Sequence, residues 1–181
     1  MKGLEDPFDI DSIEELACKI CKAITEISLI PSVLTNELED IVKQSGSYEA
    51  DLDIISMIVD RDCKSFTENQ YDVVLEICKQ KNIKLFITNP CLEFWFLLHH
   101  TNCVGLETEL KINKKAENGF NFAYNKLKEF DERYKKNNVN VEWYLENYST
   151  AEKNSQLYEK SVIKLKENIG TNIDELKNVL K

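Results

Sequence analysis

Two continuous apolar runs in the first half of the chain stand out from the mixed pattern around them. Residues 52–60, LDIISMIVD, and residues 83–88, IKLFIT, are rich in β-branched and apolar side chains, which predicts two buried strands. Between them, Thr67 and Gln70 form a capping box that predicts a helix through residue 81. Because helix and strand alternate, we expect a parallel sheet with helices on its faces.

The pattern changes after residue 104, where apolar residues recur mainly at helical spacing. Lysines and acids are interspersed here, as on solvated helix faces. We therefore predict an α/β domain over residues 1–104 and a helical C-terminal extension over 105–181 that packs on it. The predicted helices cover 116–136 and 143–148, then a stretch from a Ser149–Glu152 cap through 161–169, and lastly the residues after Asn172.

The segment 91–100, CLEFWFLLHH, predicts a short helix that is apolar on nearly every face and should be buried. It contains one carboxylate, Glu93, whose burial without a partner would cost several kcal/mol, roughly. Two interpretations remain open. Glu93 lies in the first turn, where free amides and the helix dipole favour a carboxylate, or it faces a functional edge of the sheet.

Composition narrows the class of protein. The chain has 181 residues, of which 43% are hydrophobic and 30% charged, as in a globular domain. A net charge of −9 argues against general attraction to nucleic acid, but a local basic patch or a bound divalent metal remains compatible with it.

The expected location is cytoplasmic, because the six cysteines are scattered as reduced thiols would be and no stretch is apolar enough to span a membrane. Cys18 and Cys21 have the spacing of a metal or redox pair, but on one helix face they also fit a core. No glycine-rich phosphate loop is present, so ATP hydrolysis is not expected.

Candidate chemistry begins where the first predicted strand ends. Asp60 and Asp62 follow that strand, and ligands bind at the carboxyl ends of strands in open α/β sheets. Two carboxylates can hold Mg²⁺, which keeps several waters, although loops after strands are also rich in aspartate for turn reasons. Lys64, just beyond, is a candidate for holding a phosphate.

Two motifs, VDRD at 59–62 and NPCLEFWFLLH at 89–99, resemble the RloB family. That family is similar to Toprim proteins, so the resemblance implies a Toprim-like parallel sheet with flanking helices. It also implies phosphodiester cleavage that depends on Mg²⁺ (or Mn²⁺). Family members look like parts of bacterial anti-phage or restriction-linked loci, often beside an ATPase.

The resemblance implies roles for particular residues. Asp60 and Asp62 would be metal ligands, and Glu93 and Glu5 would be catalytic, with Glu5 in the place of the Toprim glutamate. Only four residues precede Glu5, so the first strand would be short or missing. The remaining motif residues would shape the strand-to-helix turn and the helix, and they are Asn89, Pro90, Trp95 and His99. Adjacent histidines at a helix end usually satisfy the last carbonyls of the helix.

Two functions follow as expectations. The first is a metal-dependent nuclease of a defence system, acting on RNA or DNA. The alternative is a catalytically degenerate scaffold subunit that binds a partner protein such as an ATPase, to which an acidic surface is suited. A homo-oligomer is compatible with either, and no membrane association is expected.

Overall fold

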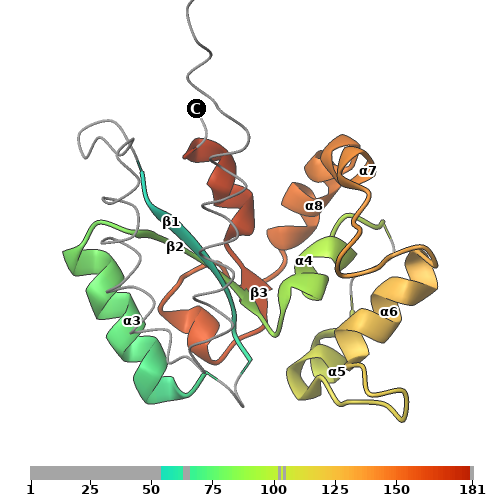
Figure 1. Cartoon of the computed structure of the whole chain (residues 1–181), viewed down its shortest axis with the longest axis horizontal. Helices are drawn as coiled ribbons and strands as arrows, with labels where there is room; N and C mark the ends of the chain where they lie inside the picture. Colours follow the sequence, from blue (N-terminus) through green and yellow to red (C-terminus); the bar gives the residue numbers. More distant parts are fainter. Residues whose placement is uncertain (1–53, 63–65, 102, 104, 180–181) are drawn as a thin grey trace, which may run out of the picture.

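The computed structural model describes residues 54–62, 66–101, 103 and 105–179 (Figure 1). Several predictions fall on residues outside these ranges. They are the roles of Glu5 and Lys64, the helix containing Cys18 and Cys21, and the length of a first strand. Within them, the expected α/β class is confirmed. A three-stranded sheet in the order β1-β2-β3 is flanked by helices.

The two strands that the apolar runs predict are present and parallel. β1 (Ser56–Asp60) pairs with β2 (Lys84–Asn89), with Ser56 opposite Lys84 and Asp60 opposite Thr88. Helix α3 (Glu68–Gln80) connects them, and the Thr67–Gln70 capping box forms as predicted. The crossover helix therefore begins where local sequence signals place it.

The third strand makes the sheet mixed rather than parallel throughout. β3 (Gly170–Thr171) pairs with β2 in the antiparallel direction. Directly after it, the Asn172 side chain continues the pairing, because its Oδ1 accepts from the Ile87 N–H (2.7 Å) and its Nδ2 donates to the Leu85 carbonyl (3.0 Å). A strand this short has no periodicity for a sequence pattern to reveal.

Alternate residues of β2 face two separate cores. Leu85 and Ile87 belong to a cluster with Tyr71 and Val74 of α3. Phe86 belongs to the other cluster, together with the short helix α4 (Leu92–Leu97) that follows β2. The sheet is thus covered by α3 on one side and by α4 and later helices on the other, as Figure 1 shows.

Helices recur through the described residues after 104, where they are separated by loops and by the short strand β3. α4 and α6 are in direct contact, and α8 also contacts α4. No described helix is both long and apolar enough to cross a bilayer. The elements are α5 (Glu107–Ile112), α6 (Phe122–Phe130), α7 (Val141–Glu146), α8 (Tyr148–Ser155) and the 3-10 helices η1 (Lys164–Lys166) and η2 (Ile173–Asn178).

The prediction of one long helix over 116–136 is wrong at both ends. Gly119 has φ +81, and the Asn121 side chain then accepts from the Tyr124 N–H as the N-cap of α6. The helix ends at Phe130, because Asp131 has left helical geometry (φ −131, ψ 89). Residues 131–140, hereafter the α6–α7 loop, are not helical.

The predicted helix through 161–169 is also shorter than expected, since α8 ends at Ser155. The chain turns back instead, and the Glu159 N–H donates to the Ile169 carbonyl while the Thr171 N–H donates to the Glu159 carbonyl. These two bonds replace helical ones and bring Gly170 against the backbone of Glu159.

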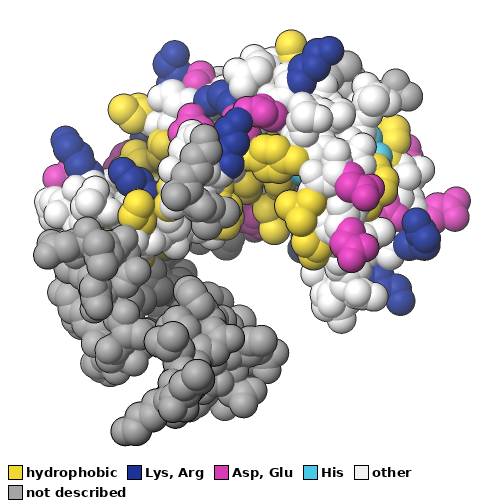
Figure 2. Space-filling model, turned by 90° about the horizontal axis from the view of Figure 1, so that it is seen from above, with side chains coloured by type: hydrophobic (Ala, Val, Ile, Leu, Met, Phe, Trp, Pro, Cys, Tyr) yellow, Lys and Arg dark blue, Asp and Glu magenta, His cyan; other side chains and the backbone are white. Residues whose placement is uncertain are grey.

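Charged side chains of both signs are interspersed on the surface. Figure 2 shows hydrophobic side chains near the middle of one face, with Lys, Arg, Asp and Glu side chains around them. This mixture agrees with the expectation that the lysine-rich segments form solvated faces.

Gly170→Ala should be strongly destabilising. A Cβ at this position would lie 1.9 Å from the Glu159 carbonyl oxygen, so two backbone segments would have to separate. We expect a loss of about 3 kcal/mol in the free energy of unfolding, measured in urea. Gly119→Ala is the comparison, with a loss of about 1 kcal/mol, because it has a positive φ but nothing within 4 Å. Equal losses for both variants would contradict the close approach at Gly170.

Candidate functional site

Asp60 joins the end of β1 to the start of α4. One of its carboxylate oxygens, Oδ1, accepts a hydrogen bond from the Leu92 N–H at 2.8 Å. Cys91, the N-cap residue of α4, provides no side-chain cap, so the aspartate of the neighbouring strand satisfies one of the free amides at this helix end. The carboxyl end of β1 is thus bound to the first turn of the helix that follows β2.

Glu93, in the first turn of α4, is buried with a partner. Only 2% of the residue is exposed, and its Oε1 lies 2.5 Å from Nζ of Lys136 in the α6–α7 loop. The Lys136 side chain is 59% exposed and its Nζ lies 5.8 Å from the centroid of the Tyr124 ring. A cation from a distant loop therefore compensates the carboxylate that the apolar helix buries.

The carboxylates of Asp60 and Glu93, hereafter the carboxylate pair, interact electrostatically. Desolvation and then the charge of Glu93 raise the pKa of Asp60 from 3.8 to about 6, although the Leu92 N–H and Lys136 act in the opposite direction. Asp60 itself reaches solvent, so protein crowds its carboxyl without enclosing it. Among the described residues, Lys136 provides a cation to this acidic centre.

Both carboxylates raise the pKa of Lys136. Desolvation lowers its pKa, but the hydrogen bond and charge of Glu93, followed by smaller effects that include Asp60, outweigh this and raise it. Lys136 is therefore positively charged over the whole physiological range, which keeps the ion pair with Glu93 intact.

Cys91 lies beside the pair as a buried thiol. The side-chain amides of Asn113 and Asn121 donate to its Sγ at 3.8 and 3.7 Å. Burial and then the charge of Glu93 raise the pKa of Cys91 well above its usual range. Because the thiolate is the nucleophilic form, Cys91 is suited to packing rather than to attack.

Asp62 is less well placed than Asp60 to interact with the other predicted site residues. It is exposed, and it is the smallest of the influences that raise the pKa of Asp60. Between them, Arg61 is 2% exposed, donates from Nε to the Lys166 carbonyl at 3.0 Å and lies over the Tyr71 ring. Arg61 thus turns into the core on the side of α3.

The described residues contain no group of three or more His, Cys, Asp or Glu side chains arranged to hold a metal ion. Of the predicted metal and catalytic residues in the described ranges, Glu93 affects the pKa of Asp60 more than Asp62 does. The roles predicted for Glu5 and Lys64 stay predictions.

The remaining motif residues hold the turn and the helix in place. Nδ2 of Asn89 donates to the Leu165 carbonyl at 2.8 Å, and a cis peptide bond joins Asn89 to Pro90. Trp95 is buried in the core. Nδ1 of His99 contacts the Trp95 carbonyl at 3.0 Å, the contact expected of a histidine that satisfies a last-turn carbonyl.

His99 is also packed among aromatic rings, edge-to-face against both Trp95 and Tyr144. Burial lowers its pKa to about 4, so the ring is neutral at physiological pH. This environment is that of a core histidine.

Lys136 is the site residue that sequence reasoning missed. It lies in a segment predicted to be the solvated end of a long helix. The burial of Glu93 did call for a cation, but the chain has 23 lysines and arginines, and no local pattern distinguishes one of them.

The chain belongs to the RloB-like family, since the family model described as "RloB-like protein" matches residues 2–180. The match covers both the sheet and the later helices, and it includes Asp60, Glu93 and Lys136. No curated protein matches the chain, and no solved structure does.

Asp60→Asn should stabilise the protein at neutral pH. An acid whose pKa is raised by folding makes the folded state less stable as pH rises, here from about 4 to about 6, and asparagine keeps an oxygen for the Leu92 N–H. Because Asp60 reaches solvent, screening limits the gain to about 1 kcal/mol. Thermal unfolding at pH 7.5 and pH 4 should show the gain at the higher pH only.

Glu117→Gln is the matched control, since Glu117 is exposed and lies outside the carboxylate pair. It should leave stability unchanged at both pH values. A gain for Asp60→Asn that is equal at pH 4 and pH 7.5 would show that the charge of Asp60 is not its source.

Lys136→Met should destabilise the fold by about 2 kcal/mol at pH 7.5, because it leaves the buried Glu93 without a counter-charge. Adding Glu93→Gln to this variant should restore most of the loss, which a double-mutant cycle in urea measures. Lys135→Met, at the exposed neighbouring position, should be neutral. Additive effects of the Lys136 and Glu93 substitutions would contradict the ion pair.

Proposed function

We propose that the chain hydrolyses phosphodiester bonds of nucleic acid with Mg²⁺ or Mn²⁺, as a component of a bacterial anti-phage or restriction-linked defence system. The observation that supports this most is the carboxylate pair, in which burial and then the charge of Glu93, from the segment after β2, raise the pKa of Asp60 at the end of β1. Membership of the RloB-like family is consistent with it.

The carboxylate pair fits a divalent ion. Mg²⁺ prefers hard oxygen ligands and is commonly held by one or two carboxylates together with waters and substrate phosphates. The pair offers such oxygens, and the raised pKa of Asp60 means that added positive charge would be favourable there. Asp62, exposed just after β1, is the further proposed ligand, and Glu5 is the further proposed catalytic residue.

When bound, the ion would supply positive charge to the phosphate oxygens as the bond is cut. Asp60 and Glu93 would hold it, and Glu93 could instead move a proton to or from the reacting water. Lys136, whose long side chain is 59% exposed, would be free to turn from Glu93 toward a substrate phosphate once the ion neutralises the pair. Lys64 is proposed for the same purpose.

The test measures cutting and metal binding together. End-labelled single-stranded and duplex RNA and DNA are incubated with wild type in Mg²⁺, Mn²⁺ or EDTA, and calorimetry follows Mn²⁺ binding. Asp60→Asn and Glu93→Gln, which keep the size of the side chains, should each reduce cutting at least about 100-fold and weaken Mn²⁺ binding. Glu117→Gln makes the same charge change on an exposed residue and should cut like the wild type.

A folded wild type that neither binds Mn²⁺ nor cuts any of the four substrates would refute the proposal. The alternative expectation, a scaffold subunit that binds a partner protein such as an ATPase, would then account for the chain better. Cutting that survives in both carboxylate variants would place the chemistry elsewhere.

A further inference from the structure

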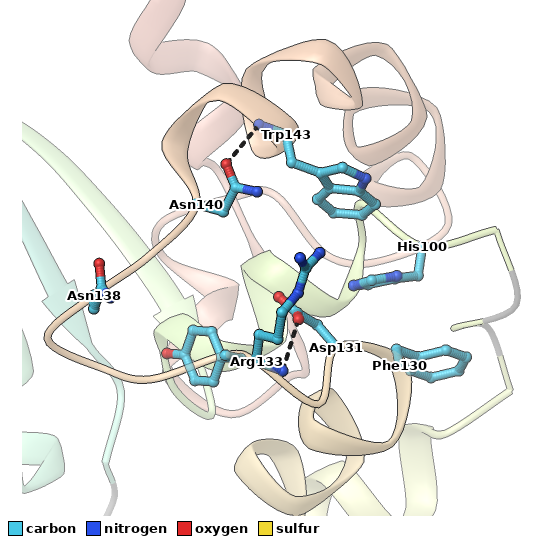
Figure 3. Close-up of a pocket in the computed structure, with 8 residues that line it drawn as sticks. His100, Phe130, Asp131, Arg133, Asn138, Asn140 and Trp143 are labelled. Atoms are coloured by element: carbon cyan, nitrogen blue, oxygen red, sulfur yellow. Dashed lines mark hydrogen bonds between the residues drawn. The ribbon is translucent and has the colours of Figure 1, made fainter.

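A concave site lies where the residues after α4 meet α6, the α6–α7 loop and α7. It is a pocket of about 440 Å³, and Figure 3 shows the side chains that line it. Aromatic and polar groups share the lining, which comprises His100, Phe130, Arg133, Asn138, Asn140 and Trp143 among others.

Flat rings form one wall. The His100 ring stacks on Phe130, with 5.2 Å between centroids and 23° between planes, and it lies 4.7 Å and 30° from Trp143. Trp143 is only partly buried, so it presents indole surface to a ligand. Such surfaces are suited to stacking against another flat, aromatic group.

His100 has hydrogen-bonding capacity left over. Its Nε2 is buried and has no partner among the residues that the structure describes, and the ring reaches into the pocket toward Asp131 and Arg133 (Figure 3). Burial lowers the pKa of His100, so the ring is neutral at physiological pH. Its Nε2 can form one hydrogen bond with a neutral partner.

Arg133 supplies a cation on the same pocket. Its residue is exposed, and its guanidinium extends toward Trp143 and His100 in Figure 3. Within residues 54–62, 66–101, 103 and 105–179, no ion pair holds it. Asn140 stands opposite, held by its cap bond to the Trp143 N–H at 3.3 Å.

The surrounding segment is locally basic in an acidic chain. Residues 126–136 carry five cationic side chains and three carboxylates, whereas the chain as a whole has a net charge of −9. Lysines and arginines close to an aromatic pocket attract a polyanion locally, even where the protein as a whole repels one.

The pocket and the carboxylate pair share one segment of backbone. Lys136 reaches Glu93 from the α6–α7 loop, and Arg133 and Asn138 of the same loop line the pocket. The α6–α7 loop therefore connects the pocket to the carboxylate pair.

We propose that this pocket binds an unpaired nucleobase and its adjoining phosphate, within the nucleic-acid strand that the carboxylate pair cuts. The base stacks on Trp143, its edge bonds to His100 and to the asparagine amides, and Arg133 binds the phosphate. A base inside a duplex cannot enter such a pocket, so the preferred substrate is single-stranded. The identity of the strand as a substrate rests on the proposed nuclease function; the binding itself does not.

The experiment separates binding from cutting. Fluorescence anisotropy measures the Kd of a labelled eight-nucleotide single strand, as RNA and as DNA, in EDTA. Arg133→Gln and Trp143→Ala should each weaken binding about tenfold, and Trp143→Phe, which keeps an aromatic face, should weaken it less. The difference between the RNA and DNA arms identifies the preferred sugar.

Three controls make the result specific. Lys79→Gln removes an exposed cation from α3 and should change Kd less than Arg133→Gln does. A duplex of the same sequence should bind more weakly than the single strand and be indifferent to Trp143→Ala. Oligonucleotide should quench the tryptophan fluorescence of wild type but not of Trp143→Phe, whose remaining tryptophan, Trp95, is buried.

The nuclease proposal and the pocket proposal can be refuted independently. Glu117→Gln should bind the single strand like wild type, since Glu117 is exposed and does not line the pocket. If the pocket variants weaken binding but no protein cuts, the nuclease proposal fails and the pocket proposal stands. If wild type does not bind the single strand, or binds it with the same Kd as folded Arg133→Gln and Trp143→Ala, the pocket proposal is overturned.

Discussion

The way in which the sheet, α4 and the α6–α7 loop pack together depends on one buried charge. α4 is apolar on most sides and sits between the sheet and the later helices, yet Glu93 in its first turn is 2% exposed. A carboxylate in that position needs a cation, and Lys136 provides it. This requirement draws the α6–α7 loop onto the start of α4, while Asp60 binds the same helix from the end of β1. Sheet, helix and loop therefore meet at one electrostatic contact.

The same contact explains why two different surfaces lie close together. Because Lys136 anchors the α6–α7 loop at Glu93, residues only a few positions away in the loop are held beside Trp143 and His100. A change in the charge around Glu93 would alter what holds the loop, and hence the wall of the aromatic pocket. The carboxylate pair and the aromatic pocket are in this way parts of one structural unit.

The sequence predicts the elements whose signals are local. The apolar runs indicate β1 and β2, the Thr67–Gln70 box indicates the start of α3, and all three elements form. The need for a partner to Glu93 also follows from the apolar helix around it. Its identity does not, because Lys136 is distant in sequence and hidden in a pattern that suggests continued helix. β3 and the Asn172 contacts with Leu85 and Ile87 likewise depend on long-range packing.

Asn172 has a consequence for how this molecule meets others. β3 covers only the end of β2, where Gly170 and Thr171 pair with Asn89 and Thr88. Further along, the Asn172 amide occupies the N–H of Ile87 and the carbonyl of Leu85, the groups to which an incoming strand would bind. The Asn172 side chain thus takes the place of a longer β3. This stretch of β2 is therefore closed to edge-to-edge association, which is a common route by which sheets aggregate.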